Sequence, residues 1–211
     1  MSQSNGAVAS GAIDTSNYRK HTHANPIQRR LIDRFHRSIL NQIAALAPET
    51  FLDAGCGEGF VAKLLLQELP GLALTGFDFN PDAVEVAKAK NPGSTFMTAS
   101  IFDLPFDDDS FDVVGCFEVL EHQTDPLPAL KELARVARKA VILSVPHEPF
   151  FCYSNAVRAK NWDIRPRGSD PDHKQFWSRK AFGQFVGQEL EVQTLTGSFP
   201  WTICVGSKRA R

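Results

Sequence analysis

Cysteine is scarce in this sequence, and its few copies are widely separated. The four cysteines stand at positions 56, 116, 152 and 204 of 211 residues, without a Cys-x-x-Cys spacing. This distribution argues against a zinc ribbon or a small disulfide scaffold, and it suits a reducing compartment. We therefore expect a cytoplasmic protein.

A charge excess of either sign is also missing. The chain carries 23 Lys and Arg against 24 Asp and Glu, so its formal net charge is -1. A dedicated nucleic-acid-binding domain is usually strongly basic. No nucleic-acid partner is therefore predicted, although this balance leaves room for a local basic patch.

Long hydrophobic runs are absent as well. The apolar stretches fall far short of the ~20 residues that span a bilayer, so no membrane association is predicted. Residues 1–16 are rich in Ser, Gly, Ala and Asn and lack the cationic start and apolar run of a signal peptide. We expect residues 1–16 to be a disordered tail and residues 17–211 to form a single domain.

Strand and helix patterns alternate along most of that domain. Helices are expected to begin near Pro26, Phe60, Pro81, Pro126 and Ser178. The expected strands cover residues 51–52, 72–78, 96–97, 111–117, 140–145, 190–195 and 201–205. This order predicts an α/β fold, namely a doubly wound, mostly parallel seven-stranded sheet of the Rossmann-like type with a C-terminal antiparallel strand pair.

One connection is much longer than the others. Residues 146–177 separate the fifth strand from the last helix by 32 residues, whereas such connections usually span about 2 to 6. We interpret this segment as a substrate-side insertion or lid. Four cations and one acid gather between Arg158 and Arg167, a cluster suited to binding a carboxylate or phosphate.

A glycine-rich turn follows the first strand, in the pattern Asp53-x-Gly55-x-Gly57-x-Gly59. In doubly wound sheets this turn approaches the ligand. A dinucleotide-binding turn requires a third small residue where this chain has Phe60, and a carboxylate beside a pyrophosphate would be unfavourable. Asp78 ends the second strand, near the spacing at which an acid meets ribose hydroxyls. These features favour an adenosine that carries an amino acid.

Taken together, the motifs at residues 51–59, 76–80, 103–114 and 118–122 make the sequence resemble the class I S-adenosylmethionine-dependent methyltransferases. The match covers roughly residues 51–145. Its last two motifs resemble the small-molecule branch that includes quinone-biosynthesis enzymes. The resemblance implies S-adenosyl-L-methionine as the cofactor.

The resemblance also implies which residues bind the methionine end of the cofactor. Asp53, Gly55 and Gly57 would line it from the glycine turn. Phe117 and Glu118, just past the fourth strand, would contact it through their backbone.

A second group would bind the adenosine. Asp78 would accept hydrogen bonds from both ribose hydroxyls, and Phe79 would lie against the adenine. Ser100 and Ile101 would meet the adenine edge. The family often has Asp where this chain has Ser100, which lacks the charge-assisted strength of a carboxylate.

Two histidines are candidate catalytic bases. His122 follows the fourth strand and His147 follows the fifth. A neutral imidazole can accept a proton from a hydroxyl as it attacks the methyl group. The alternative for His122 is a helix-start histidine bound to backbone. His21-x-His23 offers only two ligands, so no metal site is predicted.

An acidic run, Asp107 to Asp109, precedes the fourth strand. We interpret it as a solvated turn.

The sequence thus predicts a methyltransferase that acts on a small molecule by in-line displacement, with an anionic acceptor as the more specific hypothesis. A non-catalytic S-adenosylmethionine-binding protein and a methyltransferase acting on a macromolecule are the alternatives. A nicotinamide oxidoreductase is disfavoured by Asp53 and Phe60. The acceptor atom, whether oxygen, nitrogen or carbon, and the oligomeric state are left open.

Overall fold

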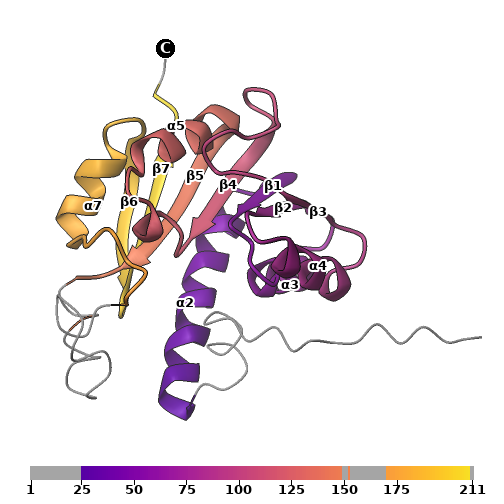
Figure 1. Cartoon of the computed structure of the whole chain (residues 1–211), viewed down its shortest axis with the longest axis horizontal. Coiled ribbons are helices and arrows are strands. Elements are labelled where there is room, and N and C mark those ends of the chain that lie inside the picture. Colours follow the sequence, from indigo (N-terminus) through magenta and orange to yellow (C-terminus); the bar gives the residue numbers. More distant parts are fainter. Residues whose placement is uncertain (1–24, 149–151, 153–169, 210–211) are drawn as a thin grey trace, which may run out of the picture.

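The computed structural model describes residues 25–148, 152 and 170–209. Their centre is a seven-stranded sheet in the order β3-β2-β1-β4-β5-β7-β6 (Figure 1). The strands are β1 (Thr50–Ala54), β2 (Ala73–Asp78), β3 (Thr95–Thr98), β4 (Phe111–Phe117), β5 (Ala137–Pro146), β6 (Glu191–Ser198) and β7 (Trp201–Ser207). The helices are α2 (Pro26–Ala45), α3 (Phe60–Glu68), α4 (Pro81–Lys90), η1 (Leu120–His122), α5 (Leu127–Val136) and α7 (Arg179–Val186).

The first five strands are parallel, and β7 pairs antiparallel with both β5 and β6. The predicted fold class and the C-terminal antiparallel pair are therefore confirmed. Chain order reverses between β1 and β4, which lie side by side at the centre of the sheet. In open α/β sheets this switch point, at the carboxyl ends of the strands, is where ligands bind.

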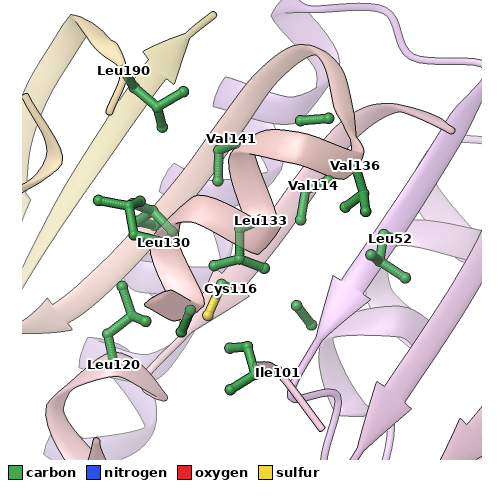
Figure 2. Packing of buried hydrophobic residues seen from close by; sticks show 14 of the residues in the cluster. Leu52, Ile101, Val114, Cys116, Leu120, Leu130, Leu133, Val136, Val141 and Leu190 are labelled. Atoms are coloured by element: carbon green, nitrogen blue, oxygen red, sulfur yellow. The ribbon is translucent and has the colours of Figure 1, made fainter. Parts of the chain in front are cut away.

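Two hydrophobic cores hold the helices on opposite faces of the sheet. One core packs α2, α3 and α4 through residues such as Phe35, Leu65 and Val84. The other packs α5 and α7, where Leu130 and Leu133 are fully buried (Figure 2). Because both faces are covered, β4 is buried along its whole length, as expected for a parallel strand.

Local signals set the helix starts. The side chains of Asn25, Asn80 and Ser178 each accept a hydrogen bond from a backbone N–H of the first turn, at 2.9, 3.0 and 3.3 Å. These caps satisfy donors that an uncapped helix leaves open. Each helix predicted from one of these residues is confirmed. β5 is longer than predicted, since it begins at Ala137, directly after α5.

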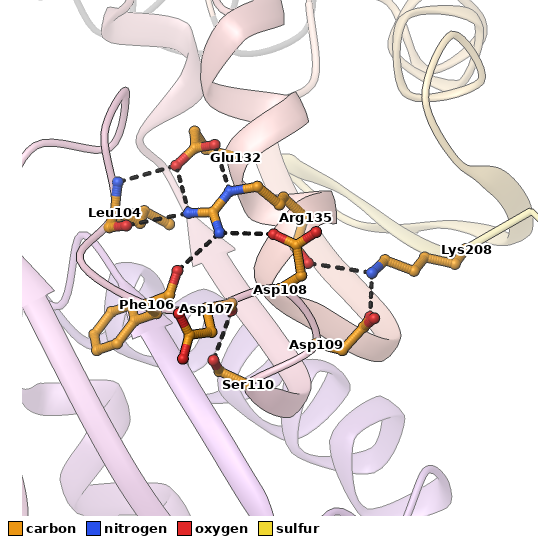
Figure 3. A network of polar contacts seen from close by, with 9 residues as sticks. All are labelled: Leu104, Phe106, Asp107, Asp108, Asp109, Ser110, Glu132, Arg135 and Lys208. Atoms are coloured by element: carbon orange, nitrogen blue, oxygen red, sulfur yellow. Dashed lines mark hydrogen bonds and ion pairs between the residues drawn. The ribbon is translucent and has the colours of Figure 1, made fainter.

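The acidic turn before β4 is exposed but also tied to the rest of the fold (Figure 3). Asp108 forms an ion pair with Arg135 of α5, and Asp109 forms one with Lys208. Arg135 also donates to the carbonyl oxygens of Leu104 and Phe106, at 3.1 and 2.8 Å. The interpretation of a merely solvated turn was therefore incomplete.

The four cysteines are buried and free. Among the described residues, every helix is too short or too polar to cross a membrane. The predicted tail, residues 1–16, and residues 149–151 and 153–169 of the predicted insertion lie outside the described residues. That segment and its basic cluster therefore stay predictions.

Candidate active site

The glycine turn after β1 is sterically tight. Gly55, Gly57 and Gly59 have φ angles of 78°, 50° and 73°, a left-handed region that side chains rarely adopt. A Cβ atom at Gly55 would lie 2.4 Å from Cγ2 of Val119. The Gly55 and Cys56 N–H groups donate to the Phe77 carbonyl, at 2.8 and 2.9 Å. Because these glycines have no side chains, the turn presents its backbone directly at the switch point.

Asp53 is a buried acid beneath this turn. Its side chain is 2% exposed, and its Oδ2 atom has no hydrogen-bond partner among the described residues. Burial, together with the negative charge of Asp78, raises the pKa of Asp53 to about 7. A cationic ligand group would restore the ionised form of this carboxylate.

Asp78 lies at the end of β2 and is 9% exposed. Its Oδ2 accepts from the Gly57 N–H and its Oδ1 from the Asn80 N–H, both at 2.9 Å. Each carboxylate oxygen retains a lone pair for a further donor. Phe79 follows immediately and is 82% exposed. Asp78, whose carboxylate is held by two backbone N–H groups, is thus followed directly by a solvent-exposed aromatic side chain.

Ser100 and Ile101 follow β3, the strand next to β2. Ser100 is exposed, and its hydroxyl accepts from the Phe102 N–H at 3.3 Å. Ile101 is buried and belongs to the core under α5. Strand order therefore places both residues on the Asp78 side of the switch point.

Glu118, directly after β4, is held by three hydrogen bonds. Its N–H donates to the Ser144 carbonyl at 3.1 Å. Its carboxylate accepts from the Ser144 hydroxyl at 3.2 Å and from Trp201 Nε1 at 2.6 Å. Its φ angle is 60°, unusual for a residue with a side chain.

The neighbouring residue Phe117 is buried. Sequence reasoning missed the Trp201 contact, since Trp201 is far away in the chain.

The two candidate bases follow neighbouring parallel strands, so both lie at the carboxyl end of the sheet. His122 is exposed in η1, and its Nδ1 lies 3.2 Å from the Asp172 carbonyl oxygen. This contact matches the backbone-bound alternative for His122. His147 is half-buried, and its pKa is lowered by burial and by the nearby Arg179. His147 is therefore neutral near pH 7.

Comparison with known proteins identifies the family. A model of the methyltransferase domain family matches residues 52–145. A ubiquinone biosynthesis O-methyltransferase of Vibrio parahaemolyticus is 31% identical over 169 residues, covering 75% of this chain and 71% of that enzyme. The chain belongs to the class I S-adenosylmethionine-dependent methyltransferases. The predicted family and enzyme class are confirmed.

Two further methyltransferases are less similar to this chain in sequence. A demethylmenaquinone methyltransferase of Thermotoga maritima is 29% identical over 106 residues, covering 50% of this chain and 46% of that enzyme. The structure of magnesium protoporphyrin IX methyltransferase from Synechocystis, with bound SAH, matches with a TM-score of 0.68 at 19% identity, over 92% of this chain and 95% of that one. This last likeness shows the fold alone.

S-adenosylmethionine is the methyl donor of this methyltransferase, as predicted. The described residues fit this donor. The buried Asp53 oxygen suits its ammonium group, and a Cβ at Gly55 would crowd the turn that approaches it.

Proposed function

We propose that this enzyme methylates a hydroxyl group of a small molecule. The observation that carries the proposal is the similarity to ubiquinone biosynthesis O-methyltransferases, which extends over 75% of the chain. An anionic acceptor is the more specific form of this proposal. It rests on the sequence of the basic cluster between Arg158 and Arg167, which lies outside the described residues.

The methionine end of the donor would lie over the glycine turn. In the proposal, the Asp53 carboxylate binds the ammonium group, and the positive-φ backbone at Gly55 and Gly57 allows close approach. The backbone of Phe117 and Glu118 completes this side. The Glu118 side chain is already engaged by Trp201 and Ser144, which is consistent with a contact made by backbone.

The adenosine end would extend towards β2 and β3. Asp78 would accept from the ribose hydroxyls with the lone pairs that its two backbone bonds leave. The exposed ring of Phe79 would cover the adenine, and Ser100 and Ile101 would meet its edge. Burying an aromatic face against a base contributes about 1 to 3 kcal/mol.

His147 would accept the proton of the reacting hydroxyl. In the proposed step, the acceptor oxygen forms a bond to the methyl carbon as the bond between carbon and sulfur breaks, and the hydroxyl proton passes to an imidazole nitrogen. Most of the rate enhancement would come from alignment of the reacting atoms at about 3 to 3.5 Å. A base contributes a further 10²- to 10⁴-fold, roughly.

The test is a labelled-methyl assay with S-adenosylmethionine, in which phenols and catechols with and without a carboxylate are compared with amines and with total RNA. We expect label in a hydroxylated small molecule. In His147→Ala, kcat should fall at least about 100-fold while binding of S-adenosylhomocysteine is retained. In the unmodified enzyme, kcat/KM should rise with pH and level off below pH 6.5, the ordinary pKa of histidine. Label found only in RNA, or only in amines, would overturn the proposed acceptor.

A further inference from the structure

Glu118 has an unusual backbone conformation that hydrogen bonds hold in place. Its φ angle of 60° lies in the left-handed region, which residues with a side chain rarely adopt. Its carboxylate accepts from Trp201 Nε1 at 2.6 Å and from the Ser144 hydroxyl at 3.2 Å. Its N–H donates to the Ser144 carbonyl at 3.1 Å. The backbone and the side chain of Glu118 are therefore anchored to β5 and β7.

The conformation of Glu118 also affects the glycine turn. Because β1 and β4 are neighbours in the sheet, Glu118 and Gly55 each follow one of two adjacent strands at the switch point. The next residue, Val119, places its Cγ2 atom where a side chain of Gly55 would stand. The φ angle of Glu118 thus sets how the chain leaves β4 and where Val119 meets the turn.

Trp201 is a rigid partner for the Glu118 carboxylate. It begins β7 and is 9% exposed. Its backbone pairs with Pro146 of β5 and with Ser198 of β6. Its ring packs against Phe35 of α2, with centroids 4.5 Å apart and planes at 33°. Because the sheet and the helix both restrict the indole, its N–H is already directed at Glu118 before any ligand binds.

A hydrogen bond to a carboxylate is stronger than one between neutral groups. Without this bond, Glu118 would spend part of its time in the more common backbone conformations. Binding of the donor would then have to restore the left-handed one, and the affinity would fall in proportion to the population lost. The contribution of one charge-assisted hydrogen bond corresponds to a factor of about ten or more.

We propose that Trp201 is a positioning residue for S-adenosylmethionine. Through its hydrogen bond to Glu118, it holds the backbone beyond β4 in the conformation that receives the methionine end of the donor. It acts through Glu118 and not by a contact of its own with the donor. This role rests on the proposed contact of Phe117 and Glu118 with the donor, and it is independent of the acceptor that is methylated.

The experiment measures the affinity of the full chain for S-adenosylhomocysteine by calorimetry. Trp201→Phe keeps an aromatic ring against Phe35 but removes the N–H, so the Kd should rise about tenfold. Trp177→Phe is the matched control, since this indole also packs on aromatic rings, those of Phe182 and Phe185. Its affinity should be unchanged. Far-UV circular dichroism checks that each variant is folded.

Variants of Glu118 distinguish positioning from general packing. Glycine adopts a positive φ angle without support, so Glu118→Gly removes the need for Trp201. In that background, Trp201→Phe should change the Kd by less than about twofold, the range expected of independent substitutions. Equal weakening in both backgrounds would overturn the proposal, and so would an unchanged affinity in folded Trp201→Phe.

Glu118→Ala lacks both the carboxylate and the freedom of glycine, and its Kd should rise at least about tenfold. Should Trp201→Phe fail to fold, Glu118→Gln tests the same bond. A neutral amide oxygen accepts about half as strongly as a carboxylate, so the Kd should rise about threefold, and an unchanged Kd would overturn the proposal.

Methyl-transfer kinetics provide a readout that a merely structural role would not give. In Trp201→Phe, KM for S-adenosylmethionine should rise about tenfold while kcat at saturating donor changes less than about twofold. A fall in kcat without a rise in KM would contradict positioning of the donor.

Failures at the different levels are distinguishable. Weaker binding in Glu118→Ala but not in Trp201→Phe would overturn the role of Trp201 alone, whereas unchanged binding in both would also overturn the placement of Glu118 beside the donor. Failure of the proposed acceptor is recognised separately, as an absence of methyl transfer to hydroxylated small molecules while the variants still show the expected pattern of S-adenosylhomocysteine binding.

Discussion

Gly55 is the residue at which backbone conformation and close packing coincide. Its φ angle is 78°, and an added Cβ would lie 2.4 Å from Val119 Cγ2. Gly71 offers a matched control, since its φ angle is 93° but nothing lies within 4 Å of its added Cβ. Gly71→Ala should cost about 1 kcal/mol of unfolding free energy from backbone strain alone. Gly55→Ala should cost about 2 to 4 kcal/mol, because steric strain is added.

Urea denaturation measures both costs. Calorimetry with S-adenosylhomocysteine should also show weaker binding for Gly55→Ala and no change for Gly71→Ala. Equal destabilisation of the two variants would mean that the contact with Val119 does not restrict this turn.

The raised pKa of Asp53 leads to a second prediction, which concerns the pH dependence of ligand binding. Burial and the charge of Asp78 raise this pKa to about 7. A cationic ligand group stabilises the ionised carboxylate, so affinity for S-adenosylhomocysteine should rise with pH up to about 7 and then level off. The raised pKa has the opposite effect on the ligand-free fold. Its contribution to stability is present below the unfolded value of about 3.9 and is lost as pH rises through about 7.

The measurement is calorimetry at several values between about pH 5.5 and about pH 7.5, a range that spans the raised pKa. Asp53→Asn should bind more weakly and with little dependence on pH. Should the variant keep the full pH dependence of the unmodified enzyme, another group controls it, and the proposed ammonium contact at Asp53 is wrong.

At the scale of elements, Arg135 joins α5 to the turn before β4. Its Nε donates to Glu132 Oε1 at 2.7 Å, and its Nη1 donates to Asp108 at 3.0 Å and to the Phe106 carbonyl at 2.8 Å (Figure 3). Loss of hydrogen bonds to a charged group typically costs about 1.5 to 3 kcal/mol. Arg135→Ala should therefore lower the free energy of unfolding by about 2 kcal/mol.

Lysine is the informative comparison at this position, because it keeps the charge but lacks the planar fork. Arg135→Lys should recover less than half of the loss in a urea titration. Full recovery would show that charge alone, and not the fork of donors, ties the turn to the helix.

The elements themselves were largely predictable from sequence, because their signals are local. Asn25, Asn80 and Ser178 cap helices where the sequence predicts helix starts. Two details were not predictable. The chain passes directly from α5 into β5 without a loop, and the pairing of Asp108 with Arg135 depends on a helix that lies 27 residues further along the chain.

At the scale of the whole molecule, the sequence predicted the end of the sheet at which the candidate residues gather but not the contacts between them. The glycine turn and Asp78 carry a local pattern, so their meeting at the switch point could be inferred. The contact of Glu118 with Trp201 spans 83 residues, and the edge-to-face contact between the His122 and His173 rings joins two separate segments of the chain. No periodicity or spacing signals such contacts, which depend on how tertiary packing brings distant segments together.

Asp112 is a further tertiary junction, at the opposite end of the sheet, and it connects three strands. Its carboxylate accepts from the Glu49 N–H at 2.8 Å, just before β1, and pairs with Arg138 and Lys139 of β5 at 2.5 and 3.3 Å. Burial alone would raise the pKa of Asp112, but the hydrogen bonds from Arg138, Glu49 and Lys139 outweigh it and hold the pKa well below its usual range.

A lowered pKa makes this carboxylate a source of acid sensitivity. Its stabilising contribution is present above the unfolded pKa of about 3.9 and is lost as pH falls from there towards the lower folded value. Asp112→Asn should therefore be less stable by about 2 kcal/mol at neutral pH and should lose less stability on acidification below about pH 4. The exposed Asp107→Asn is the control and should behave like the unmodified protein. Urea titrations across this range measure both effects, and an unchanged acid dependence in Asp112→Asn would mean that the acid transition is controlled by other carboxylates.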